Sequence, residues 1–249
     1  MGVRVPRARL IVSELPAAGG LARVVGEESS HARALRLAPG DPVALLDGSG
    51  REARGTVRRL GARMLEVEVE EVRPAVREDA PIALWVAGIR AERLSWLAEK
   101  ATELGADRIA IVSTERTQGF RAAPGLVPRL TRVVREAAKQ AERTRWPEIS
   151  GPLTLSRALL EEPSPTRIFL DLEGAAFPGS LPRSPAALLI GPEGGWTRAE
   201  SEAARAAGWQ PVALPAGKLR TETAAIAALI LLRAAREAGN SSFVPVEQR

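Results

Sequence analysis

The sequence predicts an α/β fold with two domains, a small β-barrel over residues 1–72 and a mostly parallel sheet covered by helices over residues 73–249. Three observations support this prediction. Strand-like runs are separated by turn signals in the first 72 residues. From Ile82 onward, apolar strand-like runs alternate with helical patterns, as in folds with a parallel sheet. Between these parts, the segment from Glu70 to Pro81 is charged and contains two prolines, which is typical of a domain boundary.

The first domain contains three segments with strand character. They are Arg9–Val12, Pro42–Leu46 and Met64–Glu70. The last of them alternates apolar with acidic residues, which is typical of a half-exposed strand. Residues 47–50, Asp-Gly-Ser-Gly, predict a tight turn between two strands, and residues 28–37 predict a short helix. Strands joined by short turns favour a small barrel.

The second domain alternates strands and helices. The predicted strands are Ile82–Ala87, Arg108–Val112, Arg167–Asp171, a run ending at Ile190, and Val212–Leu214. The predicted helices are Ala91–Leu104, Val127–Glu142, one that begins after Thr197, and Thr223–Glu237. Gly105 is expected to end the first of these helices, whose apolar residues recur at helical spacing. The last helix is apolar on all sides of its first turns, so we expect it to be buried, for example in a subunit interface.

Composition excludes several kinds of site. The chain of 249 residues has no cysteine and a single histidine, His31. Disulfides, thiolate metal sites, cysteine nucleophiles and histidine-rich metal centres are therefore excluded, and we expect no bound metal. The first residues lack the apolar stretch of a signal peptide, and no apolar run reaches the roughly 18 residues of a membrane helix. We therefore expect a cytoplasmic protein with no membrane partner.

The charge balance favours a polyanionic partner. The formal net charge is +5 at pH 7, and nearly all of the positive charge is arginine. Arginine pairs bidentately with phosphate and stacks on bases, which suits RNA. Basic residues recur on one face of a predicted helix and in the first domain. Those predicted to contact RNA are Arg33, Arg36, Arg132, Arg135, Lys139 and Arg143. A solvated helix face is the alternative interpretation.

Two loops in the second domain predict a small-molecule pocket. Residues 191–195, Gly-Pro-Glu-Gly-Gly, follow an apolar run, and Thr197 with Glu200 is expected to form a capping box at the start of the next helix. Residues 214–224 likewise lead from a strand into a helix. Ligands of open α/β folds bind where such loops converge, at the carboxyl ends of the strands. Ordinary turns with capping residues are the alternative.

Matching motifs extend over nearly the whole chain. They are His31–Leu37, Gly40–Asp41 with Asp47–Gly50, Lys100–Gly105, Thr114–Arg116, Glu136–Arg143, Gly191–Gly195 and Leu219–Ala224. In this order they resemble the ribosomal RNA small subunit methyltransferase E family of the SPOUT class, and the last two are highly specific for it. The second loop departs from the family pattern Leu-Gly-x-Arg-Ile-Leu-Arg at Pro215, Gly217 and Lys218. Lys218 is the residue that could supply the charge of the missing arginine.

The resemblance implies a PUA-like barrel in residues 1–72 and a SPOUT-type α/β domain with a deep trefoil knot in residues 73–249. It implies S-adenosyl-L-methionine as methyl donor, a homodimer, and N3 methylation of one uridine, position 1498, in the 16S ribosomal RNA of the small ribosomal subunit. The cofactor-binding residues that it implies are Leu170, Asp171, Leu172, Glu173, Gly174, Ile190, Gly191, Pro192, Glu193, Gly194, Gly195, Leu214, Pro215, Leu219, Arg220, Thr221, Thr223 and Ala224.

Methylation at this atom sets a chemical requirement. Uridine N3 carries a proton, so a base must remove it or a cation must stabilise the anion that forms. The chain has neither cysteine nor tyrosine. We therefore expect Arg220 to stabilise the anion and Glu193 or Glu222 to act as the base, although either carboxylate could instead orient Arg220 or cap a helix. His31 is expected to contact RNA or to have a structural role.

Two other functions fit the same motifs. A SPOUT methyltransferase acting on another RNA, such as transfer RNA, predicts activity on naked transfer RNA. A non-catalytic ribosomal RNA-binding assembly protein predicts no cofactor binding despite an intact loop at residues 191–195.

Overall fold

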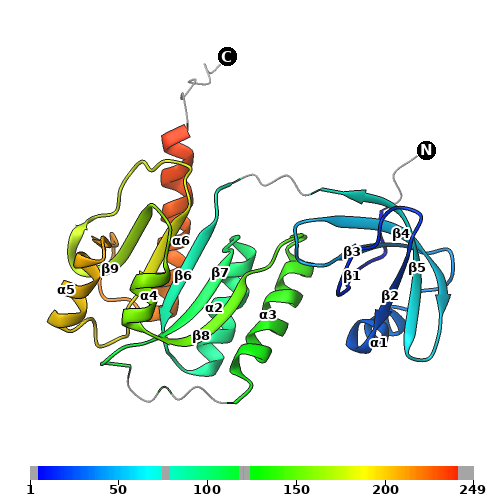
Figure 1. The fold of residues 1–249 in the computed structure, drawn as a ribbon, viewed down its shortest axis with the longest axis horizontal. Coiled ribbons are helices and arrows are strands. Elements are labelled where there is room, and N and C mark those ends of the chain that lie inside the picture. Colours follow the sequence, from blue (N-terminus) through cyan, green and yellow to red (C-terminus); the bar gives the residue numbers. More distant parts are fainter. Residues whose placement is uncertain (1–4, 75–78, 118–119, 121–123, 241–249) are drawn as a thin grey trace. The chain divides into compact units, whose positions relative to one another are not determined.

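The computed structural model describes residues 5–74, 79–117, 120 and 124–240. The chain forms two compact units (Figure 1). One unit contains Met1–Glu78 together with Arg135–Trp146, and the other contains Asp79–Val134 together with Pro147–Arg249. A segment distant in sequence therefore completes the first unit. Within the described residues, no helix combines the length and apolar character needed to cross a membrane.

The first unit is built on a five-stranded sheet. Its elements are β1 (Ala8–Ile11), β2 (Leu21–Val25), α1 (Gly26–Ala34), β3 (Pro42–Leu46), β4 (Glu52–Leu60) and β5 (Met64–Arg73). The strand order is β1-β3-β4-β5-β2, in which β1 pairs parallel with β3 and the other neighbours pair antiparallel. The predicted alternation in β5 is confirmed, because Leu65, Val67 and Val69 are fully buried in the core of this unit.

The predicted turn at residues 47–50 joins the antiparallel strands β3 and β4. Gly48 and Gly50 both adopt positive φ angles, 80° and 98°. A Cβ on Gly48 would lie 2.3 Å from the ring of Trp146, and one on Gly50 would lie 2.4 Å from the guanidinium of Arg145. The turn therefore needs glycine for its conformation and for contact with the distant segment that completes this unit.

The second unit contains a six-stranded sheet in which every neighbouring pair is parallel, as predicted. Its elements are β6 (Ile82–Ala87), α2 (Ala91–Glu103), β7 (Arg108–Ser113), the first part of α3 (Leu126–Gln140), β8 (Glu148–Thr154), α4 (Leu155–Glu161), β9 (Thr166–Ala176), β10 (Ala186–Ile190), α5 (Arg198–Ala206), β11 (Gln210–Ala213) and α6 (Thr221–Asn240). The strand order is β11-β9-β10-β6-β7-β8.

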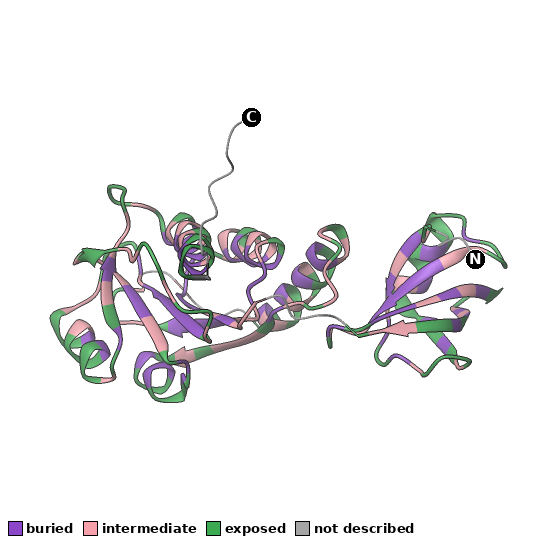
Figure 2. Ribbon diagram, turned by 90° about the horizontal axis from the view of Figure 1, so that it is seen from above, coloured by how far each residue is buried: buried purple, intermediate pink, exposed green. Residues whose placement is uncertain are grey.

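Helices cover both faces of this sheet (Figure 2). α2 and α6 pack together on one face, and α4 and α5 pack together on the other. Every residue of the central strand β10 is buried, which explains its uninterrupted apolar sequence. Gly105, with a φ of 80°, follows the end of α2 as predicted.

Four elements were not predicted by the sequence patterns: β2, β4, β8 and α4. β4 lacks a clear strand pattern because Gly55 lies at a bulge, where the register with β5 shifts. The bulge leaves no room for a side chain, since a Cβ on Gly55 would lie 2.2 Å from the carbonyl oxygen of Glu68. β8 contains Gly151 and Pro152, which predict a break. It tolerates them because it is an edge strand with an irregular register.

Two boundaries in the second unit also differ from the prediction. β9 extends to Ala176, so residues 170–174, which the family resemblance maps to a cofactor loop, belong to a strand. The C-terminal part of β9 is stabilised by pairing with β11 after a register shift. A side chain would not fit at Gly174, because the backbone of Val212 lies against it. α6 begins at Thr221 rather than at Thr223.

Candidate functional site

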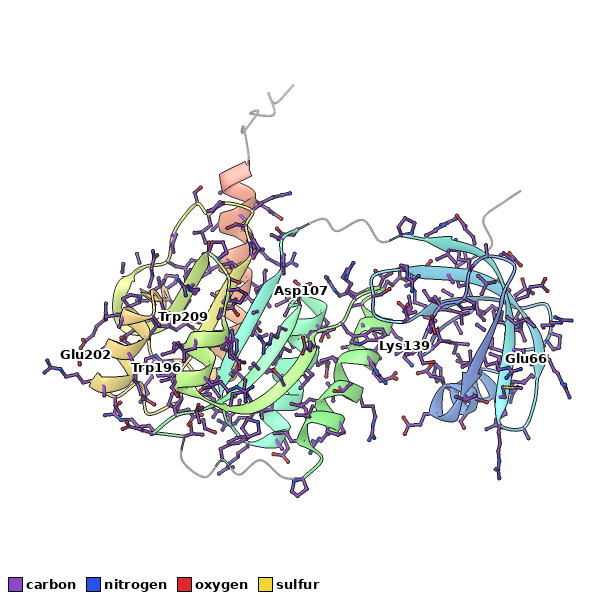
Figure 3. All side chains as sticks on the ribbon, in the orientation of Figure 1. Glu66, Asp107, Lys139, Trp196, Glu202 and Trp209 are labelled. Atoms are coloured by element: carbon purple, nitrogen blue, oxygen red, sulfur yellow. The ribbon has the colours of Figure 1, made fainter. Side chains whose placement is uncertain are left out.

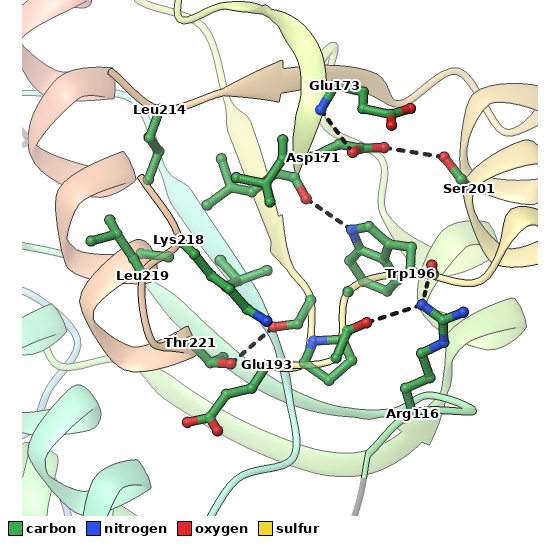
Figure 4. Close-up of a pocket in the computed structure, with 18 of the residues that line it drawn as sticks. Arg116, Asp171, Glu173, Glu193, Trp196, Ser201, Leu214, Lys218, Leu219 and Thr221 are labelled. Atoms are coloured by element: carbon green, nitrogen blue, oxygen red, sulfur yellow. Dashed lines mark hydrogen bonds between the residues drawn. The ribbon is translucent and has the colours of Figure 1, made fainter. Parts of the chain in front are cut away.

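A cavity of about 730 Å³ lies where β9, β10 and β11 end (Figure 4). Its wall is formed by the C-terminal half of β9, the first loop (residues 191–197, after β10), one face of α5 and the second loop (residues 214–220, between β11 and α6). The carboxyl ends of parallel strands are the usual ligand-binding edge of an open α/β sheet. The volume is typical of a site for a cofactor or other small molecule.

The first loop is held through its main chain. Nη1 of Arg116 donates to the carbonyl oxygens of Gly194, at 3.0 Å, and of Trp196, at 3.1 Å. From the other side, Oγ1 of Thr221 donates to the carbonyl oxygen of Gly191 at 3.0 Å. Gly195 has a φ of 71°, which favours glycine. These contacts fix the path of the loop beside the cavity.

Trp196 forms a wall of the cavity. Its Nε1 donates to the carbonyl oxygen of Leu170 at 2.8 Å, which joins the first loop to β9 (Figure 4). The ring also packs edge-on against Phe169, with centroids 6.2 Å apart. Gly191 lies directly against this ring, since a Cβ there would be 2.8 Å from Cε2 of Trp196. The first glycine of the loop is therefore required by close packing.

The predicted capping box at the start of α5 is confirmed. The backbone N–H of Glu200 donates to Oγ1 of Thr197 at 3.2 Å, and that of Thr197 donates to Oε2 of Glu200 at 2.9 Å. Oε1 of the same carboxylate accepts from the backbone N–H of Glu115 at 2.9 Å. Glu200 is buried and links the helix start to the segment after β7.

Carboxylates lie along the β9 side of the cavity. Oδ1 of Asp171 accepts from the backbone N–H of Glu173 at 3.2 Å, and its Oδ2 accepts from the hydroxyl of Ser201 at 3.4 Å. Opposite them, the second loop contributes Lys218, whose exposed side chain is directed toward the first loop (Figure 4). The lining of the cavity therefore carries charges of both signs, with the carboxylates of β9 on one side and cationic side chains that include Lys218 elsewhere.

Most of the residues predicted to bind the cofactor line this one cavity. They are Leu170, Asp171, Leu172, Glu173, Ile190, Gly191, Pro192, Glu193, Gly194, Gly195, Leu214, Leu219, Thr221 and Ala224. Four predicted residues are not in the lining: Gly174, Pro215, Arg220 and Thr223. Gly174 lies against the backbone of β11, and the other three are exposed to solvent.

The three candidate catalytic residues lie in different surroundings. Glu193 lines the cavity and is exposed. Glu222, in the first turn of α6, is buried behind the lining. Arg220 precedes α6 and is exposed, and its side chain makes no hydrogen bond or ion pair with the described residues. Both carboxylates form ion pairs with Arg93 of α2, a residue that sequence reasoning did not identify.

The residues predicted to contact RNA differ in their availability. Arg33, Arg36, Arg132 and Arg135 are exposed, and Arg143 is half-buried. Lys139 (Figure 3) is only 8% exposed and forms ion pairs with Glu28 at 2.9 Å and Glu136 at 2.8 Å. Burial acts to lower the pKa of Lys139, but its hydrogen bonds to the two carboxylates outweigh burial and raise the pKa above its usual value. Lys139 is therefore already neutralised within its own unit.

Several lining residues were outside the predicted set. They are Arg116, Trp196, Thr197, Arg198, Ser201, Glu202, Arg205, Val212, Ala216, Gly217 and Lys218. Arg116 and Trp196 adjoin or belong to motifs that the sequence shows clearly, so their position could have been inferred. The residues of α5 carry no comparable signal, because a polar helix face looks the same whether or not it borders a cavity.

Comparisons with known proteins agree with this geometry. The model of the RNA methyltransferase domain matches residues 77–233. A ribosomal RNA small subunit methyltransferase E of Mycobacterium bovis is 36% identical over 88% of this chain and 88% of its own length. The corresponding protein of Synechocystis is 33% identical over 82% of this chain and 70% of its own length.

Solved structures show the same fold. A ribosomal RNA small subunit methyltransferase E of Neisseria gonorrhoeae, bound to S-adenosyl methionine, has a TM-score of 0.82 at 28% identity and covers 91% of this chain and 96% of its own. A methyltransferase of Legionella pneumophila, in complex with the bound cofactor SAM, has a TM-score of 0.80 at 26% identity, over 93% of this chain and 98% of its own. These matches confirm the resemblance found in the sequence: the chain belongs to the ribosomal RNA small subunit methyltransferase E family of RNA methyltransferases.

Proposed function

We propose that this chain transfers a methyl group from S-adenosyl-L-methionine to N3 of uridine 1498 in the 16S ribosomal RNA of the small ribosomal subunit. The cavity at the ends of β9, β10 and β11 carries the proposal, because two loops with the motifs of the family converge on it. Relatives in the same family are methyltransferases, and two similar solved structures have the cofactor bound.

The residues of the cavity suit this cofactor. S-adenosylmethionine has a positively charged sulfonium and ammonium group, and Asp171 and Glu173 provide carboxylates on the β9 side of the cavity. Leu170, Leu214 and other aliphatic side chains provide apolar surface for its adenine ring. A cavity of about 730 Å³ accommodates a molecule of this size.

S-adenosylmethionine, when bound, supplies an electrophilic methyl group. The chain's own residues must hold the uridine with N3 toward the cavity and remove the proton from N3. Arg220, the exposed last residue of the second loop, stabilises the negative charge that develops on the oxygens of the uracil. Glu193 or Glu222 accepts the proton. The unpaired guanidinium of Arg220 supports its role, since no described carboxylate neutralises it.

We also propose that the two domains have different roles. Residues 1–72 form a PUA-like barrel that binds RNA, and residues 73–249 form the SPOUT domain with a trefoil knot. Exposed arginines at positions 33, 36, 132 and 135 support an RNA-binding role. A homodimer is proposed as the active form, and Ile230, a large apolar residue of α6 that is 49% exposed, supports it.

The direct test is methyl transfer from labelled S-adenosylmethionine to three substrates: unmodified small ribosomal subunits, free 16S ribosomal RNA and transfer RNA. The proposal predicts labelling of the first or second substrate, with N3-methyluridine as the product. Labelling of transfer RNA alone would indicate a methyltransferase with another target. Absence of both transfer and cofactor binding would indicate an RNA-binding protein without catalysis.

A further inference from the structure

Arg93 lies between the first loop of the cavity and the first turn of α6. It belongs to the first turn of α2, and its side chain is 30% exposed. Its Nη1 donates to Oε1 of Glu193 in the first loop at 2.5 Å. Its Nε lies 3.6 Å from Oε1 of Glu222 in the first turn of α6. One guanidinium therefore contacts both carboxylates that the proposed chemistry considers as the base.

The two carboxylates differ in what they can reach. The side chain of Glu222 is only 10% exposed, and its Oε2 is fully buried without a hydrogen-bond partner among the described residues. Its other oxygen faces Arg93, so neither oxygen is available to a substrate in the cavity. The side chain of Glu193 is 53% exposed and lines the cavity. Of these two carboxylates, Glu193 is therefore the one placed to take a proton from a bound nucleoside.

Burying a carboxylate with an unpaired oxygen raises the free energy of the folded state, since the hydrogen bonds lost with water are replaced only in part. Glu222 offsets this cost through its ion pair with Arg93 and through its position at the positive end of α6. The guanidinium of Arg93 is in turn held from behind by Glu222. The contact with Glu222 therefore fixes the position of the guanidinium, and the fixed guanidinium can orient the carboxylate of Glu193.

We infer that Arg93 is a positioning residue that orients the carboxylate of Glu193 toward the substrate, and that Glu222 is the anchor of Arg93 rather than the base. This inference rests on the proposed methyl transfer. The main chain of the first loop is held separately, by Arg116 and Thr221. Loss of Arg93 should therefore release the side chain of Glu193 without displacing the loop that forms the cavity.

The test compares Arg93→Met with the matched control Arg90→Met in the full-length chain. Arg90 precedes α2 and is exposed, and its side chain makes no hydrogen bond or ion pair with the described residues. Methylation of unmodified small subunits gives kcat and KM, calorimetric titration gives the Kd of S-adenosylmethionine, and thermal unfolding reports the fold.

For Arg93→Met we expect kcat to fall about 10- to 100-fold, the loss expected when a reacting group is misplaced, while the Kd of the cofactor changes by less than about twofold. Arg93→Lys should recover part of kcat, because an ammonium can still pair with both carboxylates. Glu222→Gln should lower kcat as well. The double variant Arg93→Met/Glu222→Gln should be no slower than Arg93→Met alone, because both changes break one chain of contacts.

A second readout does not depend on activity. Carbodiimide-coupled labelling of carboxylates, followed by peptide mass spectrometry, should modify Glu193 several-fold faster in Arg93→Met than in the wild type. Glu202, an exposed carboxylate on α5, serves as the internal reference. Equal labelling of Glu193, an unchanged kcat, or a loss of kcat that parallels cofactor affinity and thermal stability would overturn the inference. A wild-type chain that methylates no RNA would instead refute the proposed function.

Discussion

Replacing Gly191 by alanine should disturb the wall of the cavity. A Cβ at this position would lie 2.8 Å from Cε2 and 3.0 Å from Cζ2 of Trp196, which is closer than carbon atoms approach in a packed interior. Trp196 is not free to move, because its Nε1 donates to the carbonyl oxygen of Leu170 and its ring packs against Phe169. The added methyl group must therefore displace either the ring or the first loop.

The size of the effect follows from these contacts. We expect the free energy of unfolding to fall by about 1–3 kcal/mol, the usual cost of overpacking. For a chain of this length, each kcal/mol lowers Tm by about 2–4 °C. Scanning calorimetry measures this shift. Titration with S-adenosylmethionine should also show weaker binding, since the first loop and β9 are joined through Trp196.

Gly217→Ala is the matched control for stability. Gly217 lines the same cavity from the second loop, but a Cβ there has no heavy atom within 4 Å and its φ lies outside the left-handed region. Its free energy of unfolding should stay within about 0.5 kcal/mol of the wild-type value, which is usual for surface substitutions. A Gly191→Ala variant that melts with the wild type, or equal losses in the two variants, would refute the packing argument.

Three further predictions concern charged residues. Arg220→Ala should abolish methyl transfer while cofactor affinity stays close to wild type, because its side chain lies outside the lining; full activity would exclude the proposed role. Charge reversal at Arg132 and Arg135 should flatten the dependence of RNA affinity on salt. The slope of log K against log salt concentration should change by up to roughly 0.7–0.9 for each phosphate that is no longer neutralised. An unchanged slope would show that these arginines lie on a solvated helix face that does not bind RNA. Lys139→Met should instead reduce stability by about 1–3 kcal/mol, since it breaks charged hydrogen bonds of a nearly buried group. Because the folded pKa of Lys139 is raised above 10.5, its contribution should be complete below that pH and should disappear as the pH rises through the folded value. Urea unfolding of wild type and Lys139→Met at neutral and strongly alkaline pH measures this difference, and a difference that is constant with pH would contradict it.

The sequence predicts the elements whose residues alternate or repeat strictly. β5 shows this clearly, because each inward position is apolar and most outward positions are acidic. The capping box of Thr197 and Glu200 is similarly predictable, since both of its hydrogen bonds are local. Both loops were identified as parts of one pocket because strand–loop–helix order places them at the same edge of the sheet.

What the sequence does not reveal depends on contacts between distant segments. β8 is stable as a strand despite Gly151 and Pro152 because β7 pairs with it from one side only. The ion pair of Arg93 with Glu193 joins residues 100 positions apart. No local pattern distinguishes Arg93 from Arg90, which lies just before the same helix. The ion pair of Lys139 is likewise not visible in the sequence, because Glu28 lies far away along the chain and only the fold brings the two side chains together.

One measurement tests the central claim most directly. Small ribosomal subunits that lack the modification are incubated with the chain and labelled S-adenosylmethionine, the labelled nucleoside is identified, and its position is mapped by primer extension, with Arg220→Ala as the control. The account predicts N3-methyluridine at position 1498 of the 16S ribosomal RNA and none with the control. Label in another nucleoside or at another position, or no transfer to subunits or to free ribosomal RNA, would contradict it.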